Sequence, residues 1–460
     1  MSKLKRAASA ALATCLVLLA GCSGAGSGAI STPSLAGTSA VPSGSGDATP
    51  AATDLSSYKY SKTGSVVEVT FWTAAVEEIN QQLVDKFNET TGKDQNIHVT
   101  AQYQGDYWEM QQKINAASIA GTLPNAFIDE VSMTRGFADD DVILNLEPYM
   151  QANSFDNSAF QIGDLGNLYM GEDMYAFPHM RSVPVMYVNK TLAKSVGLSE
   201  AGPATFDELT TYLQACYDKT GQPPMYLFNY DFWVMEALLH SYSNTNILSD
   251  DEKSCNINSE GGVKLVTYLK GLVDKGLVKV LPITDMNAFY ATIANPSTAL
   301  WLTSIGGYKA FAPMASQYGI DLGVSMIPEG ENGTRGVPVG GSNTYLANAG
   351  TDQQKAAAFI FMTWLSDTEQ AAFASSQTGY LPTKLASLET SVMKETLAQF
   401  PGFQVAFDEL QYCKMRPTTG SYHEVEDLMC EKINSILLDN LDIKSSLDTL
   451  AKDVNAILNR

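Results

Sequence analysis

The sequence predicts an α/β protein, and three observations lead to that prediction. Of its 460 residues, 45% are hydrophobic and 17% charged, which supports a folded core rather than disorder. Short segments that alternate apolar and polar residues recur along the chain. Segments of helical length lie between them, and strands joined by helices usually pair in parallel. The length corresponds to two or three domains.

Each predicted element has its own local signal. The strands alternate or form short apolar runs, and they cover residues 67–71, 97–103, 126–128, 185–188 and 298–302. Helices are predicted over residues 76–91, 107–120, 258–275, 352–365 and 424–460. Gly92 and Gly276 follow two of these helices where a C-cap belongs. Thr205 with Glu208, and residues 366–369, mark the starts of two more helices.

The N-terminus has the features of an export signal. Lys3, Lys5 and Arg6 precede an apolar stretch, residues 7–19, which is too short to span a bilayer. The run Leu19-Ala20-Gly21-Cys22 resembles a bacterial lipobox, whose cysteine is lipidated and becomes the mature N-terminus. We therefore expect a lipoprotein signal peptide at 1–21 and a lipid, such as palmitate, on Cys22. A plain secretory signal that contains a cysteine is the alternative.

Composition also predicts a tether and excludes some partners. Residues 22–65 are rich in Ser, Gly, Ala, Thr and Pro after the cysteine, so we expect a flexible linker. The formal net charge is -21, and loss of three basic residues with the signal would lower it to -24. Such an acidic chain is poorly suited to nucleic acid or anionic lipid.

Four cysteines remain in the predicted mature body: Cys216, Cys255, Cys413 and Cys430. They allow three disulfide connectivities, of which 216–255 with 413–430 is local in sequence. Buried free thiols are the alternative. Their spacings do not resemble a zinc site, and we expect no metal.

Sequence signatures of common enzymes are missing. The chain has no Gly-Lys-Ser/Thr, no His-Glu-x-x-His and, in the predicted folded region, no Gly-x-Ser-x-Gly. We therefore expect no catalytic residues and no cofactor. An exported glycosidase remains an alternative, with Glu130 and Asp231 as candidate carboxylates. A structural adhesin is a further alternative.

Several local motifs occur in the order found in one family. They are Gln104-Gly105-Asp106-Tyr107, Glu130-Val131, Ser182-Val183-Pro184-Val185, Gly340-Gly341-Ser342 and Thr378-Gly379-Tyr380-Leu381-Pro382. From Val67 onwards the chain resembles family 1 extracellular solute-binding proteins of ABC importers, most closely the sn-glycerol-3-phosphate-binding branch. The resemblance implies a two-lobed periplasmic-binding-protein fold (type II), with the ligand in the cleft between the lobes. Lobe 1 would comprise 66–181 and 336–385, and lobe 2 would comprise 182–335 and 386–460.

The resemblance also implies a set of ligand-binding residues. These are Tyr107, Glu130, Ser182, Ser304, Gly340, Gly341, Tyr380 and Arg416. An arginine fork suits phosphate, and hydroxyl and carboxylate groups suit glycerol hydroxyls. Trp233 is added as an aromatic side chain able to stack on a sugar. Several have a structural alternative: Tyr380 packing a turn, Arg416 in a surface or inter-lobe ion pair, Ser182 and the glycines shaping a hinge, and Trp233 in the core.

The expected function follows from the resemblance. A lipid-anchored, monomeric receptor on the outer face of the membrane would capture glycerol-3-phosphate or a glycerophosphodiester by hinge closure. It would then dock on the permease subunits of an ABC importer. The alternative ligand is a neutral mono- or oligosaccharide, which the acidic net charge favours.

Overall fold

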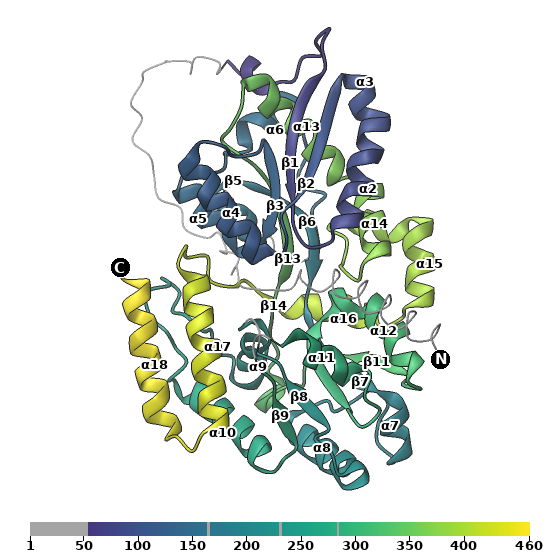
Figure 1. The fold of residues 1–460 in the computed structure, drawn as a ribbon, viewed down its shortest axis with the longest axis vertical. Coiled ribbons are helices and arrows are strands. Elements are labelled where there is room, and N and C mark those ends of the chain that lie inside the picture. Colours follow the sequence, from purple (N-terminus) through teal and green to yellow (C-terminus); the bar gives the residue numbers. More distant parts are fainter. Residues whose placement is uncertain (1–53, 163–165, 230–231, 283–284) are drawn as a thin grey trace, which may run out of the picture.

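The computed structural model describes residues 54–162, 166–229, 232–282 and 285–460, which form two lobes (Figure 1). Lobe 1, in the upper half of the view, is built on a five-stranded sheet of order β2-β1-β3-β13-β6. Lobe 2 is built on a five-stranded sheet of order β11-β7-β10-β8-β9. The predicted α/β class is confirmed.

The lobe 1 sheet is mixed rather than wholly parallel. β1 (Val67–Thr73) pairs in parallel with β2 (Ile97–Tyr103) and β3 (Ala126–Glu130), as predicted. β13 (Gly340–Leu346) is antiparallel to both β3 and β6 (Ala176–Ser182). The sequence did not predict β13, which runs in the opposite direction because the chain enters it from lobe 2. Among the predicted strands, the parallel expectation is wrong for 185–188 and 298–302, which pair antiparallel.

Helices and short strands complete lobe 1. They are α2 (Glu77–Phe87), α3 (Lys93–Gln95), α4 (Tyr107–Ala120), α5 (Thr134–Asp139), α6 (Glu147–Asn153), β4 (Tyr169–Met170), β5 (Asp173–Met174), α13 (Asp352–Leu365) and α14 (Thr368–Gln377). The bounds of α4 and α13 match the prediction, and both helices begin with a capping box, at Asp106 and Thr351.

Gly92 is not the predicted C-cap. A π turn, Asn88–Gly92, carries the chain from α2 into α3, and the left-handed residue is Asn96, with a φ of 58°. A Cβ on residue 92 would lie 2.7 Å from the Ile97 carbonyl oxygen. Glycine is therefore required here by close packing of the backbone.

Lobe 2 contains β7 (Pro184–Asn189), β8 (Met225–Leu227), β9 (Val278–Val280), β10 (Leu300–Ser304) and β11 (Leu322–Ser325). Its helices are α7 (Lys190–Ser195), α8 (Phe206–Thr220), α9 (Trp233–Ser243), α10 (Glu260–Asp274), α11 (Met286–Ile293), α12 (Tyr308–Gln317), α16 (Phe403–Glu409), α17 (Tyr422–Leu438) and α18 (Ile443–Leu458). The predicted helix over 424–460 is thus two helices, and Asp442 caps the second.

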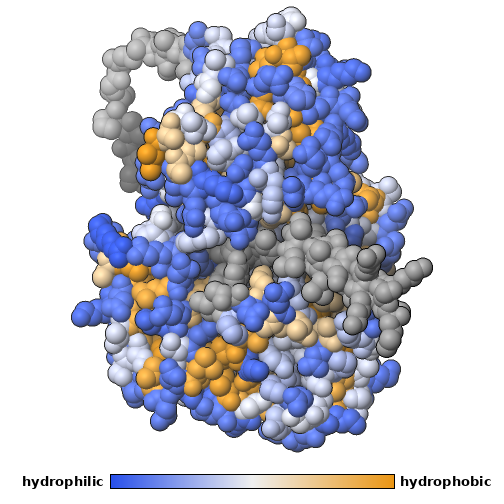
Figure 2. Space-filling view, viewed as in Figure 1, coloured by the Kyte–Doolittle hydropathy of each residue, from blue (hydrophilic) through white to orange (hydrophobic). Residues whose placement is uncertain are grey.

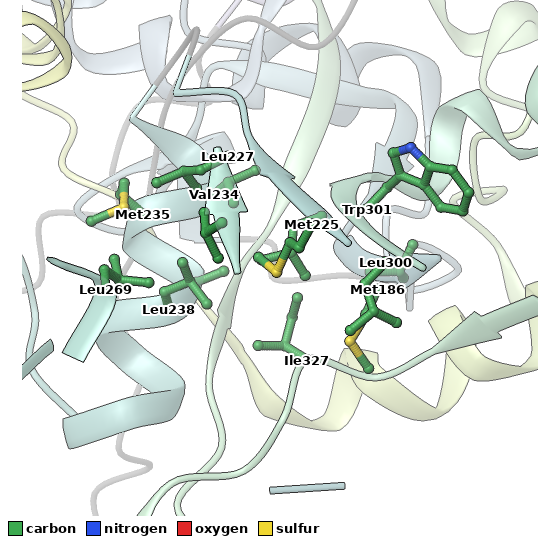
Figure 3. Packing of buried hydrophobic residues seen from close by; sticks show 14 of the residues in the cluster. Met186, Met225, Leu227, Val234, Met235, Leu238, Leu269, Leu300, Trp301 and Ile327 are labelled. Atoms are coloured by element: carbon green, nitrogen blue, oxygen red, sulfur yellow. The ribbon is translucent and has the colours of Figure 1, made fainter. Parts of the chain in front are cut away.

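The core of lobe 2 lies between its sheet and its helices. Figure 3 shows Val234, Met235 and Leu238 of α9 beside the strand residues Met225 and Leu227. All five are at most 5% exposed. This packing fixes α9, which begins at Trp233, against the sheet.

Three segments connect the lobes. Val183 joins β6 to β7, and the chain returns through β12 (Val337–Pro338) into β13. The third connection contains η7 (Leu385–Glu389) and α15 (Ser391–Gln399). β12 also pairs in parallel with β14 (Cys413–Lys414), which brings the C-terminal part of the chain to the same crossing.

The start of the described chain is packed against lobe 1. Tyr58, in a short 3-10 turn, makes an edge contact with Tyr149, with ring centroids 5.0 Å apart. Tyr60 donates a hydrogen bond of 2.8 Å to the Gln95 carbonyl oxygen. Residues 54–65 were predicted to be part of the flexible tether, but these two aromatic side chains attach them to the folded body.

Two further sequence questions concern thiols and membrane spans. Cys216 and Cys255 are buried free thiols, so the pairing 216–255 is not formed. Burial raises the pKa of each thiol to about 11, which keeps both protonated at neutral pH.

Within the described ranges, no helix combines the length and apolarity needed to cross a bilayer.

Gly341 is a position where both the backbone conformation and the close packing exclude a side chain. Its φ is 103°, and a Cβ there would lie 2.3 Å from the Met180 carbonyl oxygen. We expect Gly341→Ala to lower the free energy of unfolding by at least ~2 kcal/mol. Urea denaturation measures this. Gly271→Ala is the control, since nothing lies within 4 Å of a Cβ there, and it should be neutral or slightly stabilising. Equal stability of the two variants would contradict the packing described.

Candidate functional site

Ser182, Gly340 and Trp233 meet where β6 leaves lobe 1 and β13 enters it. Gly340 lies opposite Ser182 in the strand register. A Cβ on Gly340 would lie 2.7 Å from the Trp233 ring and 2.8 Å from Ser182 Oγ. Trp233 Nε1 donates to the Val339 carbonyl oxygen at 3.4 Å, and the side chain is 3% exposed. The indole of lobe 2 therefore packs on the backbone of the crossing strand, which requires glycine at 340.

Ser304 and Tyr380 form a second contact. Ser304 ends β10, and its Oγ accepts a hydrogen bond of 2.9 Å from the Gly306 amide. A Cβ on Gly306 would lie 3.2 Å from Tyr380 Cζ. The Tyr380 ring, 1% exposed, thus lies against the turn that leads from β10 into α12. The structure brings these two predicted residues together, although they come from segments far apart in sequence.

Arg416 is surrounded by carboxylates from both lobes. Its Nε is 2.7 Å from Glu236 Oε2 on α9, and its Nη2 is 2.7 Å from Glu426 Oε1 on α17. Its Nη1 is 3.9 Å from Glu130 Oε1, at the end of β3 in lobe 1. The arginine side chain is 1% exposed. Of the interpretations that the sequence left open, the structure shows the inter-lobe ion pair, and direct ligand contact by Arg416 stays a prediction.

Aromatic residues extend the cluster around Arg416. Tyr422 Oη donates a hydrogen bond of 2.5 Å to Glu236 Oε1. His423 Nδ1 lies 3.2 Å from Glu426 Oε2. On the lobe 1 side, the Trp108 ring makes an edge contact with His423, with centroids 5.2 Å apart. The two lobes are therefore in contact through both charged and aromatic side chains.

Burial changes the ionisation of the carboxyl groups. It raises the pKa of Glu236 to about 7, against the opposing effect of Arg416. Burial likewise raises the pKa of Glu130 well above its usual range, although Arg416 and hydrogen bonds from Ser132 act in the opposite direction. Removing these carboxyl groups from water disfavours their charged form. Burying them therefore costs free energy, which the Arg416 guanidinium offsets.

One side-chain oxygen of Glu130 accepts hydrogen bonds and the other accepts none from the described residues. Its Oε2 accepts from the Ser132 amide at 2.8 Å and from Ser132 Oγ. Its Oε1 has no hydrogen-bond partner within the described residues. Ser342 lies directly opposite Glu130 in the β13–β3 register, and its Oγ is likewise without a partner there. Directly opposed residues project to the same face of a sheet.

The remaining predicted residues flank this region. Tyr107 is the first residue of α4 and 2% exposed, one position before Trp108. Gly341 lies opposite Arg181 in the strand register. A surface pocket on lobe 2, lined in part by Lys190, Tyr308 and Asp321, contains none of the predicted residues. Cys22 and Asp231 lie outside the described residues.

Sequence reasoning missed Glu236, Glu426, Tyr422 and Ser342. Glu236 was the most detectable, because it is the one charged residue in the apolar run Trp233-Val234-Met235-Glu236-Ala237-Leu238-Leu239. A carboxylate in such a run needs a buried partner. Ser342 is part of a motif that the sequence analysis used, but only its glycines were predicted to bind.

Residues 82–401 match the model of the bacterial extracellular solute-binding protein family. The chain belongs to this family. It is therefore a solute-binding protein that acts outside the cytoplasm and not an enzyme, so the glycosidase alternative is not supported.

Named relatives show the same similarity over most of the chain. The sn-glycerol-3-phosphate-binding periplasmic protein UgpB of Brucella abortus is 25% identical over 418 residues, covering 85% of this chain and 93% of the relative. The UgpB protein of Pectobacterium atrosepticum is 22% identical, with 86% and 92% covered.

Solved structures share the fold. UgpB from Mycobacterium tuberculosis in complex with glycerophosphocholine matches with a TM-score of 0.74 at 20% identity, covering 86% of this chain and 99% of that one. The sugar-binding protein MalE from Xanthomonas citri matches with a TM-score of 0.72 at 19% identity, covering 85% and 97%. The two-lobed binding-protein fold predicted from the sequence is confirmed.

The buried position of Arg416 leads to a stability prediction. Arg416→Met would leave three buried carboxyl groups without their cation, so we expect a loss of about 3–5 kcal/mol in the free energy of unfolding. Arg460→Met is the matched control, because Arg460 pairs with Glu424 at 2.8 Å with a 66% exposed side chain. The control should lose less than ~1 kcal/mol. Similar losses for both variants in chemical denaturation would contradict the arrangement around Arg416.

Proposed function

We propose that this protein is the lipid-anchored receptor of an ABC importer and that it binds a small polyhydroxylated solute between its lobes. The observation that carries the proposal is the meeting of hydrogen-bonding groups from both lobes at Glu130, Ser342 and Arg416. A solute bound there would contact both lobes at once. Hinge movement about the three connections would enclose and release it.

The charge around Arg416 guides the choice of solute. The guanidinium already pairs with Glu236 and Glu426 and has Glu130 nearby, so its positive charge is already compensated by carboxyl groups and is not available to a phosphate. Free glycerol-3-phosphate would bring further negative charge to buried carboxylates. A neutral mono- or oligosaccharide avoids that repulsion and supplies hydroxyl donors to carboxylate oxygens.

A glycerophosphodiester is the second candidate. The named relatives bind sn-glycerol-3-phosphate, and a solved relative holds glycerophosphocholine. A diester carries one negative charge fewer than the fully ionised phosphomonoester, and its head group can carry a compensating cation. The resemblance therefore favours glycerol phosphates, whereas the local charge favours the saccharide or a zwitterionic diester.

Calorimetry of the full chain, purified in detergent, tests the solute. We expect heat from maltose or glycerophosphocholine and weaker binding of glycerol-3-phosphate, by at least about tenfold. Glu130→Ala should weaken binding, whereas Glu331→Ala, which changes an exposed carboxylate of lobe 2, should not. Tight binding of glycerol-3-phosphate alone would overturn the charge argument. Failure of every compound would count against a receptor and favour a structural role.

The lipid anchor needs a separate experiment. In cells supplied with a labelled fatty acid, the wild-type chain should carry the label and partition into detergent. Cys22→Ser should lose the label, because the lipobox cysteine is the only proposed acceptor. Cys413→Ser, in a half-buried position of β14, should keep it. Labelling of the Cys22→Ser variant would contradict the proposed anchor.

A further inference from the structure

The carboxylates around Arg416 outnumber the guanidinium. Glu236 and Glu426 each make a contact of 2.7 Å and occupy Nε and Nη2. Glu130 is left 3.9 Å from Nη1, beyond hydrogen-bonding distance. His423 Nδ1 lies 3.2 Å from Glu426 Oε2, and its ring contacts Trp108 of lobe 1. The positive charge at this site is thus largely committed to the two lobe 2 carboxylates.

Two polar atoms at the end of the lobe 1 sheet remain without hydrogen-bond partners in the described part of the chain. They are Glu130 Oε1 and Ser342 Oγ, on adjacent strands and on the same face of the lobe 1 sheet. Both residues are 1% exposed. A buried polar atom without a partner costs on the order of 1–3 kcal/mol, and more for a carboxylate. These two atoms belong to opposed residues of adjacent strands. They mark a position where a ligand would supply the missing hydrogen bonds.

The charge and hydrogen-bonding groups at the site limit which chemical group of a ligand can bind there. A phosphate offers only acceptors and negative charge at neutral pH, and it would further oppose ionisation of carboxyl groups whose charged forms burial already disfavours. A sugar hydroxyl can donate to Glu130 Oε1 but leaves the excess charge unbalanced. A protonated amine supplies both an N–H donor and a positive charge, and charge-assisted hydrogen bonds are the stronger kind.

We infer that the solute carries a protonated amine, which donates to Glu130 Oε1 beside Ser342. This inference rests on the proposed receptor function and specifies its ligand further. An amino sugar and an ethanolamine glycerophosphodiester both offer this group. Both combine a positive charge with an N–H donor. A quaternary ammonium such as choline has the charge but no N–H, because its nitrogen carries no hydrogen.

Competition calorimetry on the full chain in detergent tests the inference with matched compounds. Glucosamine is compared with glucose and N-acetylglucosamine, and glycerophosphoethanolamine with glycerophosphocholine. In whichever series binds, the amine should bind at least about tenfold more tightly than its partners. The series that binds identifies the source of the amine. Equal affinities within the series would overturn the inference.

A variant tests the assignment to Glu130. Glu130→Gln keeps the shape and one acceptor oxygen but removes the charge, so the preference for the amine should fall to about onefold while the neutral partner still binds. Glu331→Gln should keep the full preference. An unchanged preference in Glu130→Gln would overturn the role of Glu130. The wild-type comparison decides the inference even where the variant does not fold.

These results separate the two proposals. Binding of maltose, glucose or glycerophosphocholine with no advantage for any amine would leave the receptor function intact and remove only the amine. Failure of every amine and every neutral compound would remove both.

Discussion

The contact between Arg416 and its carboxylates governs how the two lobes meet. Two of the three carboxylates, Glu236 and Glu426, belong to lobe 2 and lie at 2.7 Å. The third, Glu130, belongs to lobe 1 and lies at 3.9 Å. Most of the cost of burying the guanidinium is therefore offset within one lobe. The inter-lobe part is a weaker, longer-range attraction, so lobe 2 keeps a satisfied arginine if the lobes separate.

The crossing strands provide a complementary rigid element. Gly340 and Gly341 let β13 approach the Trp233 indole and the β6 backbone more closely than any side chain would allow. This packing fixes the start of β13, which also positions Ser342 opposite Glu130. The polar face of the site is therefore set by backbone packing in lobe 1 and the charged face by α9 and α17 in lobe 2. On the side shown in Figure 2, hydrophilic side chains cover most of lobe 1, whereas lobe 2 also shows several hydrophobic patches.

The sequence predicted what depends on local signals and missed what depends on distant partners. Helices α4 and α13 have the predicted bounds because their capping residues lie within three positions. The direction of β13 was not predictable locally, since it depends on which lobe the chain comes from. Arg416 was identified, but its environment was not, because Glu236 is 180 residues away. Tyr58 and Tyr60 are a further example. Residues 54–65 were predicted to be flexible from the average composition of the linker, and this average does not show that two tyrosines attach them to lobe 1.

Charge acts in the same direction at two length scales. The whole chain has a formal net charge of -21, which repels anions at a distance but is screened beyond roughly 8 Å at physiological salt. At the site itself, three carboxyl groups converge on one guanidinium where water is largely excluded, so screening is much weaker. A phosphate would need an arginine whose positive charge is not already compensated. In this chain Glu236 and Glu426 already compensate the charge of Arg416. The position of an arginine in the sequence is thus a poor guide to its ligand, and the decisive quantity is the number of carboxylates that already share it.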